Sequence, residues 1–576
     1  MKAFDIVSHS FLFKTLQKFG FGPNFTQWIR LIYTSVSSSV KTNGWLSAFI
    51  QLERGLTQGC PLSMPLYALT AETMAINICS NPRIHGIKPP GSQAEAKLSQ
   101  FADDTTLLLT DEQSITETFH VFELYEHASG AKINKNKCKG LWSGSLSYRT
   151  DQIYGFDWFN DFIPEKILGQ FFGNVNCTTM NWNVKVQKIN NIIAAWKHRD
   201  LSYKGRALII NALLTSTLWY NVTSLAVPPW AIAQIEQSIY GFFGDNKHPL
   251  VNRDILALPV KEGGFNIPRL ERKVQAFRLN TLRRLLSEGD AHWKNFTAYF
   301  LRVSSMRVGK LSLALTFPLQ CIDPTIPEFH KELLSAWQKF RPCQIHYQTP
   351  TTVTDILNEP LFLNKQITIS DEPFLYRNWI AAGITNICDV CYEVIPNFLP
   401  VSAIHEILSG VDENCTLASV TREFNRLLSA IPKEWIKQIC SEQIRPAPSN
   451  QPCFAIRGST SGKIPEDIQM CKTRHLYHLI HELRKPSVPA INRWKSLLQP
   501  IPIFDAKRWI NIYSPLVNNK QGDINWKIVP RVLPTGLSLN RMGVLHSANC
   551  HRCGAIDNIE HALLECGSCF VHDGGR

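Results

Sequence analysis

Two adjacent carboxylates, Asp103 and Asp104, are the most informative pair in this sequence of 576 residues. They lie between short apolar segments, in what the pattern predicts to be a hairpin turn. Two like charges this close stay ionised at little cost only when a cation lies between them. Carboxylate oxygens suit Mg²⁺, which keeps water and substrate phosphates as its other ligands. The alternative is an ordinary polar turn, because Asp is common in turns.

A second set of residues near the C-terminus has the spacing of a zinc site. Three thiols and one imidazole follow the pattern C-x₂-C-x₇-H-x₄-C, namely Cys550, Cys553, His561 and Cys566. This set matches a tetrahedral structural Zn²⁺ site. Cys569 is an alternative fourth ligand. In the other interpretation the thiols are free, and His561 and Cys566 lie on the buried face of a helix.

A further C-x₂-C pair, Cys388 and Cys391, has no Cys or His pair at short spacing after it. We interpret these two residues as ordinary thiols.

A glycine-containing segment precedes the acidic pair by some forty residues. It runs over residues 54–63 and contains Gly55, Gln58 and Gly59. The glycines permit a close, sharply bent backbone before a helix, which would suit packing against a flat ligand such as a base pair. Gln58 offers both a hydrogen-bond donor and an acceptor.

The elements that must position these residues follow from apolar spacing and turn signals. We predict helices over residues 11–34 (broken at 20–23), 61–79 and 114–128, the last one ending at Ser129-Gly130. Hairpins are predicted around Asn43-Gly44 and over 98–110, and a further strand begins at Lys132. After about residue 180, helices dominate, at 183–224, 230–243 and 270–287. This order predicts an α+β domain with an antiparallel sheet, followed by a mainly helical region.

Composition and charge bound the class of protein. Hydrophobic residues are 44%, and 16 Cys in 576 residues are too few for a disulfide scaffold. The formal net charge is +13, and residues 181–310 carry 19 Lys and Arg against 8 Asp and Glu. This excess permits a polyanionic partner, although a solvated basic surface is the alternative. The sequence shows no signal peptide or spanning segment, so we expect an intracellular protein of the nucleus or cytoplasm without a membrane partner.

These motifs together resemble the reverse transcriptases of LINE-type non-LTR retrotransposons. Residues 2–9 look like the end of the family's motif A, 54–63 like motif B, and 101–104 like the F/Y-A-D-D box of motif C. Residues 130–137 look like motif D, and 168–173 like motif E, the primer grip. The resemblance implies a right-hand polymerase fold with a partial palm over 1–175, a helical thumb over 176–310, a connector over 311–525 and a zinc-binding region over 526–576.

The resemblance also implies an activity and roles for particular residues. The family transfers nucleotides from dNTPs to a DNA primer on an RNA template, with two Mg²⁺ ions at the reacting phosphate. Asp103 matches a metal ligand, and Asp104 is its companion. Phe4 matches the residue that excludes the 2′-hydroxyl of ribonucleotides, and Lys137 matches a general acid for the leaving pyrophosphate. Leu168 and Gly169 match the primer grip.

The basic helical region would contact phosphates of the template–primer duplex, as the thumb does in this family. The residues predicted for this contact are Lys185, Lys188, Lys204, Arg206, Arg272, Arg283 and Arg284. Trp526, the LPTG segment at 533–536 and the RMG segment at 541–543 precede the Cys/His set, as they do in the family's zinc-binding region.

One departure from the family concerns motif A. The family pattern D-x-E-K-A-F-D puts its metal-binding Asp two residues before Met1, and Asp5 matches only the last letter, for which we expect a helix cap or turn role. We therefore interpret the chain as an N-terminally truncated reverse transcriptase without meaningful polymerase activity. The alternative is a catalytically inactive, retroelement-derived nucleic-acid-binding protein. A metal-dependent nuclease would explain the carboxylates, but not motifs B and E together with the basic helices. The sequence gives no oligomeric state.

Overall fold

A computed structural model describes most of the chain. The described residues are 3–57, 59–88, 95–160, 162–173, 175–245, 251–287, 289, 291–304, 326–346, 352–357, 359–362, 364, 366–392, 395–411, 414–441, 455–456, 468–482, 485–486, 488–500 and 505–567. The chain divides into two compact units, Met1–Cys177 with Gly289–Tyr299, and Thr178–Glu288 with Phe300–Arg576.

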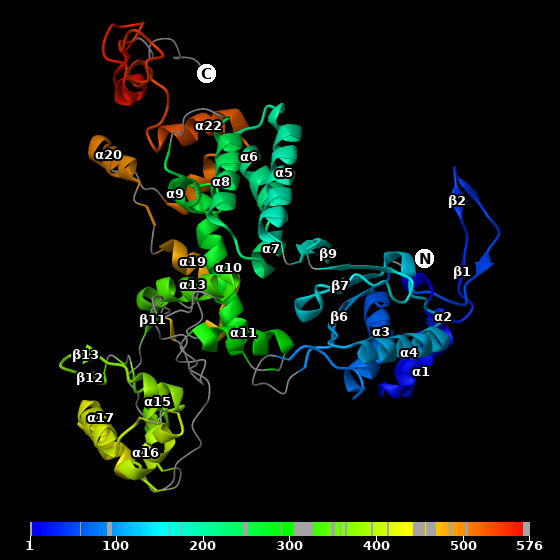
Figure 1. Cartoon of the computed structure of the whole chain (residues 1–576). Coiled ribbons are helices and arrows are strands. Elements are labelled where there is room, and N and C mark those ends of the chain that lie inside the picture. Colours follow the sequence, from blue (N-terminus) through cyan, green and yellow to red (C-terminus); the bar gives the residue numbers. More distant parts are fainter. Residues whose placement is uncertain are drawn as a thin grey trace. The chain divides into compact units, whose positions relative to one another are not determined.

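The first unit combines helices with short paired strands (Figure 1). Its helices are α1 (His9–Lys18), α2 (Pro23–Tyr33), α3 (Ser63–Ser80) and α4 (Glu112–Ser129). Its strands are β1 (Ser37–Ser38), β2 (Lys41–Thr42), β3 (Trp45–Leu46), β4 (Ile50–Gln51), β5 (Leu98–Phe101), β6 (Asp104–Leu107), β7 (Lys139–Trp142), β8 (Asp157–Asn160), β9 (Glu165–Ile167) and β10 (Gln170–Phe172). The mixture confirms the predicted α+β class.

Helices α1, α3 and α4 pack together and form the core of this unit. The apolar sequence of helix α3 matches its position, because other segments cover it on several sides and bury Leu66, Tyr67 and Ile78. Helix α4 begins where the Asp111 carboxylate accepts a hydrogen bond from the Ser114 N–H at 2.7 Å. It ends at Gly130, which has a φ of +75°. The predicted helix and its glycine stop are confirmed.

The strands of the described part pair two by two, so no wide sheet forms there. Strands β2 and β3 pair antiparallel around Asn43 and Gly44, whose φ values of +49° and +90° confirm the predicted turn. Strands β7 and β8 pair parallel, unlike the other described pairs. The prediction of a strand from Lys132 is wrong by several residues, because the turn η2 (Lys135–Lys137) comes before β7 begins.

The second unit is mainly helical, as predicted. Its first helices are α5 (Cys177–Lys197), α6 (Tyr203–Ile209), α7 (Trp219–Ser224), α8 (Pro229–Gly244), α9 (Arg253–Leu256) and α10 (Leu270–Leu286). Helix α11 (His292–Ser304) begins in the first unit and ends in the second. The predicted helical stretch over 183–224 is thus broken, with a π-helical turn at Ile210–Leu214. Helices α5 to α10 share one core, which includes Trp182, Ile235 and Phe265.

Later segments of the chain complete this unit. They are α13 (Glu328–Gln344), α14 (Val353–Leu357), α15 (Arg377–Ala381), α16 (Val401–Ser409), α17 (Leu417–Ala430), α18 (Lys433–Ser441), α19 (Thr473–Glu482), α20 (Pro489–Leu497), α21 (Ala506–Asn511), α22 (Asn519–Ile528) and α23 (Gly536–Arg541), with β11 (Ile345–His346), β12 (Thr368–Ile369), β13 (Glu372–Pro373) and β14 (Ala455–Ile456). Helices α13 and α19 pack against α10, whereas α14 to α18 enclose a core of their own.

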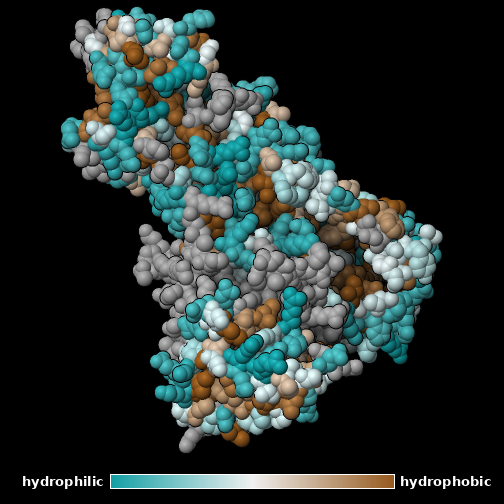
Figure 2. All heavy atoms as spheres, turned by 60° about the vertical axis from the view of Figure 1, so that its left-hand side comes forward, coloured by the Kyte–Doolittle hydropathy of each residue, from teal (hydrophilic) through white to brown (hydrophobic). Residues whose placement is uncertain are grey.

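The segment before the Cys/His set is attached to the core of helices α5 to α10. The Trp526 indole N–H donates to the Gly263 carbonyl at 2.7 Å, and Trp509 lies in the same core. The Trp509 ring fills the space beside Gly263. A Cβ atom at position 263 would lie only 2.6 Å from this ring, so a larger residue would collide with it. Hydrophobic and hydrophilic residues alternate on the face seen in Figure 2. Among the described helices, none is long and apolar enough to cross a bilayer.

Candidate functional site

The segments that match motifs A and B lie side by side in the first unit. The Gly55 N–H donates to the Val7 carbonyl and the Leu56 N–H donates to the Phe4 carbonyl, both at 2.8 Å. The His9 Nε2 atom hydrogen-bonds the Gly55 carbonyl, also at 2.8 Å. The N-terminal segment is therefore fixed to the loop that leads into α3.

The two glycines of motif B have different surroundings. Gly55 has a φ of +94°, and a Cβ there would lie 3.0 Å from the Asp5 carbonyl oxygen. Gly55 thus makes a close approach to the chain's own backbone at Asp5. Gly59 has a φ of +89°, and a Cβ there would meet no atom of the described residues within 4 Å, so the space beside it is open among them. Gln58 lies outside the described residues.

Residues from motifs A and C lie near Tyr67 on α3. The Phe4 ring stacks on the Tyr67 ring with centroids 4.4 Å apart. Burial is the main cause that raises the pKa of Tyr67, and the nearby Tyr125 and the negative charge of Asp103 raise it further. Phe4 therefore contacts Tyr67, and Asp103 lies within electrostatic range of Tyr67, although these residues are up to about one hundred positions apart in the sequence.

The acidic pair lies on the hairpin of β5 and β6, at a register one residue away from the prediction. Phe101 pairs with Asp104, so Ala102 and Asp103 form the turn and Asp104 begins β6. Ala102 has a φ of +54°, and both carboxylates are exposed to solvent. Exposed, adjacent oxygen ligands of this kind fit a hydrated divalent cation.

A buried lysine anchors this hairpin to α3. Lys97 directly precedes β5 and is 8% exposed. Its Nζ donates to the carbonyls of Cys79 and Asn81 at 3.1 and 2.9 Å. These carbonyls lie at the C-terminal end of α3, where a cation is favoured. The helix that carries Tyr67 therefore also fixes the start of the strand that leads to Asp103.

The residues that match motifs D and E lie on turns. Lys137 is exposed on η2, and no hydrogen bond or ion pair between described residues joins it to Asp103 or Asp104. Leu168 and Gly169 form the two-residue turn between β9 and β10, with φ values of +47° and +80°. This hairpin is of the tight type that requires positive φ at both turn residues.

The predicted phosphate contacts divide into internal and exposed cations. Arg272 is 5% exposed, and its guanidinium binds Asp254 and the His481 Nδ1 atom, both at 2.9 Å. Arg206 donates to the Phe242 and Phe243 carbonyls, and Arg283 donates to the Gln469 carbonyl. These arginines stabilise the fold, and the burial of Arg272 excludes it from phosphate contact. Lys188, Lys204 and Arg284 are exposed, whereas Lys185 is half-buried, and burial followed by the nearby Lys188 lowers its pKa.

The four predicted zinc ligands come together in the second unit. Their ligand atoms all lie within 4.8 Å of one another. The Cys553 Sγ atom is 3.1 Å from the His561 Nε2 atom and 4.0 Å from the Cys566 Sγ atom. Ligand atoms around a tetrahedral Zn²⁺ are about 3.4–3.8 Å apart, so these four atoms are close enough to reach that spacing with small shifts. Cys569 lies outside the described residues.

Local backbone contacts shape this cluster. The Cys550 N–H donates to the Ala555 carbonyl at 2.7 Å, which closes the turn between the first two thiols. The backbone N–H of Arg552, followed by the ring of His561, lowers the pKa of the Cys550 thiol to about 6 and so favours the thiolate. The Gly536 N–H donates to the Asp557 carboxylate at 2.5 Å, which joins the LPTG segment to the cluster.

Other predicted or overlooked residues have clear surroundings. Cys391 is buried and Cys388 half-buried, and the Cys388 Sγ atom lies 3.5 Å from the Asp389 carboxylate. Sequence analysis missed Tyr67 and Lys97. Tyr67 lies in an apolar helical run where nothing distinguishes it, and an isolated Lys before a strand is ordinarily expected to be exposed.

Comparison with known proteins agrees with this geometry. Residues 1–153 match the family model described as reverse transcriptase (RNA-dependent DNA polymerase). The chain is 27% identical to the Transposon TX1 uncharacterized 149 kDa protein of Xenopus laevis, over 98% of this chain and 44% of that protein. It is also 27% identical to the Pol polyprotein from the type-2 retrotransposable element R2DM of Drosophila melanogaster, over 24% of this chain and 12% of that protein.

A third relative is a Pol polyprotein from the type-1 retrotransposable element R2 of Popillia japonica, 25% identical over 26% of this chain and 24% of that protein. The chain thus spans less than half the length of each of these relatives. The family model and these relatives together show that residues 1–153 are similar to the reverse transcriptases of non-LTR retrotransposons.

Proposed function

We propose that this chain is part of an RNA-directed DNA polymerase that extends a DNA primer with dNTPs on an RNA template. The observation that carries the proposal is the stacking of Phe4 on Tyr67 of α3, within electrostatic range of Asp103. The reaction needs a carboxylate close to a residue that can contact the sugar of an incoming nucleotide. Phe4, stacked on Tyr67, is the residue of this neighbourhood that would contact the sugar and exclude a 2′-hydroxyl.

The acidic pair would hold the metal ions of this reaction. Asp103 and Asp104 would bind Mg²⁺, which supplies charge stabilisation at the attacking and leaving oxygens. Lys137 would protonate the leaving pyrophosphate. Gly59, Leu168 and Gly169 would lie against the primer and template, and the open space beside Gly59 supports that role.

We further propose that the 576 residues by themselves have no meaningful polymerase activity. They contain no acidic residue at the first position of motif A, where the family places a metal ligand. Misplacing a reacting group by about 1 Å can cost roughly a hundredfold in rate, and losing a metal ligand should cost more.

Primer extension tests both proposals. The chain is incubated with a primed homopolymer RNA, Mg²⁺ and dNTP, beside a form extended at its N-terminus by the family's motif A and the residues before it. We expect extension only from the longer form, and loss of that extension in Asp103→Asn. Robust extension by the 576 residues would refute the inactivity, and extension that survives Asp103→Asn would refute the site.

The second proposal is a catalytically inactive nucleic-acid-binding protein. The exposed Lys188, Lys204 and Arg284, together with Lys185, favour it because they do not depend on the acidic pair. Replacing these four residues by Ala should reduce the dependence of duplex affinity on salt by a slope of up to about 3.6. An unchanged slope in a filter-binding titration would count against this thumb contact.

We also propose that Cys550, Cys553, His561 and Cys566 bind a structural Zn²⁺. The fit of the four ligand atoms within 4.8 Å supports this. The purified chain should contain one zinc per molecule by elemental analysis, and Co²⁺ substitution should give the absorption of a tetrahedral thiolate site. Cys553→Ser should lose the metal, whereas Cys440→Ser, at an exposed thiol on α18, should retain it. Equal zinc in both variants would contradict the assignment.

A further inference from the structure

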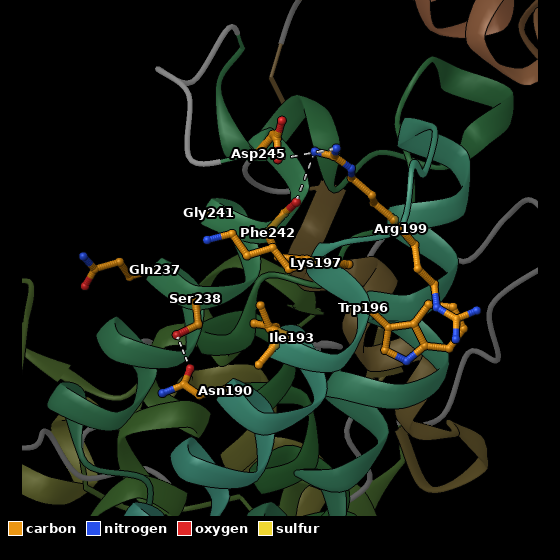
Figure 3. Close-up of a pocket in the computed structure, with 12 residues that line it drawn as sticks. Asn190, Ile193, Trp196, Lys197, Arg199, Gln237, Ser238, Gly241, Phe242 and Asp245 are labelled. Carbon is orange, nitrogen blue, oxygen red and sulfur yellow. Dashed lines mark hydrogen bonds and ion pairs between the residues drawn. The ribbon is translucent and has the colours of Figure 1, made fainter.

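A groove between helices α5 and α8 has the features of a nucleotide-binding site. Its cavity volume is about 370 Å³, and Ile193 and Phe242 form its apolar part (Figure 3). Ligand sites of about 300–1,000 Å³ with mainly apolar walls and a few polar groups are typical of small molecules or of single groups of larger ones. Asn190, Ile193, Ala194 and Lys197 follow helical spacing on α5, so one face of that helix forms a wall.

The groove carries positive charge that the fold does not neutralise. Among the described residues, Lys197 and Arg199 form no ion pair, and both are exposed. Arg206 is different, because it lies 3.7 Å from Asp245 and donates to carbonyls at the end of α8. The groove therefore offers two free cations at one end, where an anionic group would be stabilised.

An aromatic ring and amide groups lie beside these cations. The Arg199 guanidinium lies over the Trp196 ring, 4.5 Å from its centroid, and Figure 3 shows the two side chains together. At the other end, the Ser238 hydroxyl donates to the Asn190 Oδ1 atom at 2.9 Å. The amide nitrogen of Asn190 stays available as a donor toward a base. Aromatic and guanidinium planes with neighbouring cations are the usual means of binding unpaired bases and their phosphates.

We propose that this groove binds one unpaired nucleotide of a single-stranded nucleic acid. Lys197 and Arg199 would hold the phosphodiester, and the base would enter the groove against the stacked Trp196 and Arg199 side chains. An unpaired base can be turned into a cavity of this size, whereas a base inside a duplex cannot. Lys185 and Lys188 lie on another face of α5, so this site is separate from the proposed duplex contacts.

The test measures binding and contains neither metal nor dNTP, so it does not depend on the acidic pair. Fluorescence anisotropy with labelled 12-nucleotide oligo(rU) and oligo(dT) is followed at several salt concentrations on the full chain. In the double variant K197E/R199E we expect about tenfold weaker binding and a salt slope lower by about 1.4. The matched control K433E/K437E makes the same charge change on exposed α18 and should bind like the unmodified chain.

A second variant tests the shape of the groove without changing its charge. Ala194→Trp adds a large side chain at an exposed position of the wall and removes no cation. It should weaken binding about fivefold or more with an unchanged salt slope. Gln237→Trp fills the groove from α8 and should act in the same way, which guards against a folding defect of one variant. RNA and DNA should bind alike, since stacking and phosphate contacts do not distinguish the sugar.

Three results would overturn the proposal. Unchanged affinity in both Ala194→Trp and Gln237→Trp would show that no base enters the groove. An equal loss in K433E/K437E would show that net charge alone governs binding. If unlabelled duplex competed with the labelled oligonucleotide as strongly as unlabelled single strand does, Lys197 and Arg199 would belong to a surface that binds duplex.

Discussion

The ring of Phe4 lies against the ring of Tyr67, with centroids 4.4 Å apart and planes inclined by 23°. This contact fixes the N-terminal segment on helix α3. Helix α3 also holds Lys97 at its C-terminal end, and Lys97 begins the strand that leads to Asp103. One helix therefore sets both the aromatic and the acidic part of the proposed active site.

Removing the Tyr67 ring should destabilise the first unit. Tyr67 is 8% exposed, and truncating a buried aromatic side chain to Ala costs roughly 3–5 kcal/mol. We expect this loss for Tyr67→Ala in urea unfolding, and a loss below about 1 kcal/mol for Tyr67→Phe, which keeps the stack. Trp45→Ala serves as a control, because Trp45 is 82% exposed and should change little. A similar loss in both alanine variants would contradict this role of Tyr67.

The two glycines of motif B should respond differently to alanine. Gly55→Ala combines a left-handed φ with a Cβ only 3.0 Å from the Asp5 backbone, so it should cost more than the ~1–2 kcal/mol of the backbone conformation alone. Gly59→Ala meets no neighbour among the described residues and should cost only that conformational part. Urea unfolding of the two variants checks the difference. If Gly59→Ala proved the more destabilising of the two, the contact between Gly55 and Asp5 would be wrong.

Lys97 should stabilise the acidic hairpin more than its exposed neighbour Lys88. Lys97→Met leaves the Cys79 and Asn81 carbonyls without their charged donor and should cost about 1.5–3 kcal/mol. Lys88 lies at the surface, 4.0 Å from Glu95, and Lys88→Met should cost less than about 1 kcal/mol. Hydrogen exchange across 95–110, measured by mass spectrometry, should accelerate only in the Lys97 variant. Equal hydrogen-exchange rates in the two variants would show that Lys97 does not anchor the hairpin.

A buried histidine should make the second unit sensitive to acid. His330 contacts the rings of Phe300 and Phe329, its Nδ1 atom has no hydrogen-bond partner among the described residues, and burial lowers its pKa to about 4. Its ordinary pKa in the unfolded chain is about 6.5. Because the unfolded state binds the proton more readily, the stabilising contribution is full above pH 6.5 and is lost as the pH falls toward 4.

His330→Phe should remove this dependence. Between pH 7.5 and pH 5, we expect the unmodified chain to lose about 1–2 kcal/mol more unfolding free energy than the variant. Urea titrations of both proteins at the two pH values measure this difference. The contributions of all other titrating groups cancel, because the two proteins share those groups. The same pH dependence in both proteins would show that His330 takes up its proton without a cost to folding.

Much of the first unit could be predicted from local patterns. The turn at Asn43-Gly44, the glycine stop of α4 and the Asp103 hairpin depend on neighbouring residues only, and the structure has them close to the predicted positions. The spacing of the Cys/His set likewise predicted that four ligand atoms could meet, because short loops keep such ligands within reach of one another. Local chemistry determines these features, so the sequence alone was enough for them.

Long-range packing decided the rest. Arg272 and Lys188 are equivalent cations in the sequence, yet one is buried against Asp254 and the other is exposed. Gly55 and Gly59 are equivalent glycines, yet only one meets the Asp5 backbone. The stack of Phe4 on Tyr67 and the groove between α5 and α8 join segments that are dozens of residues apart. The segments that pack over a side chain decide whether it is buried. Only the tertiary structure could therefore distinguish Arg272 from Lys188, and Gly55 from Gly59.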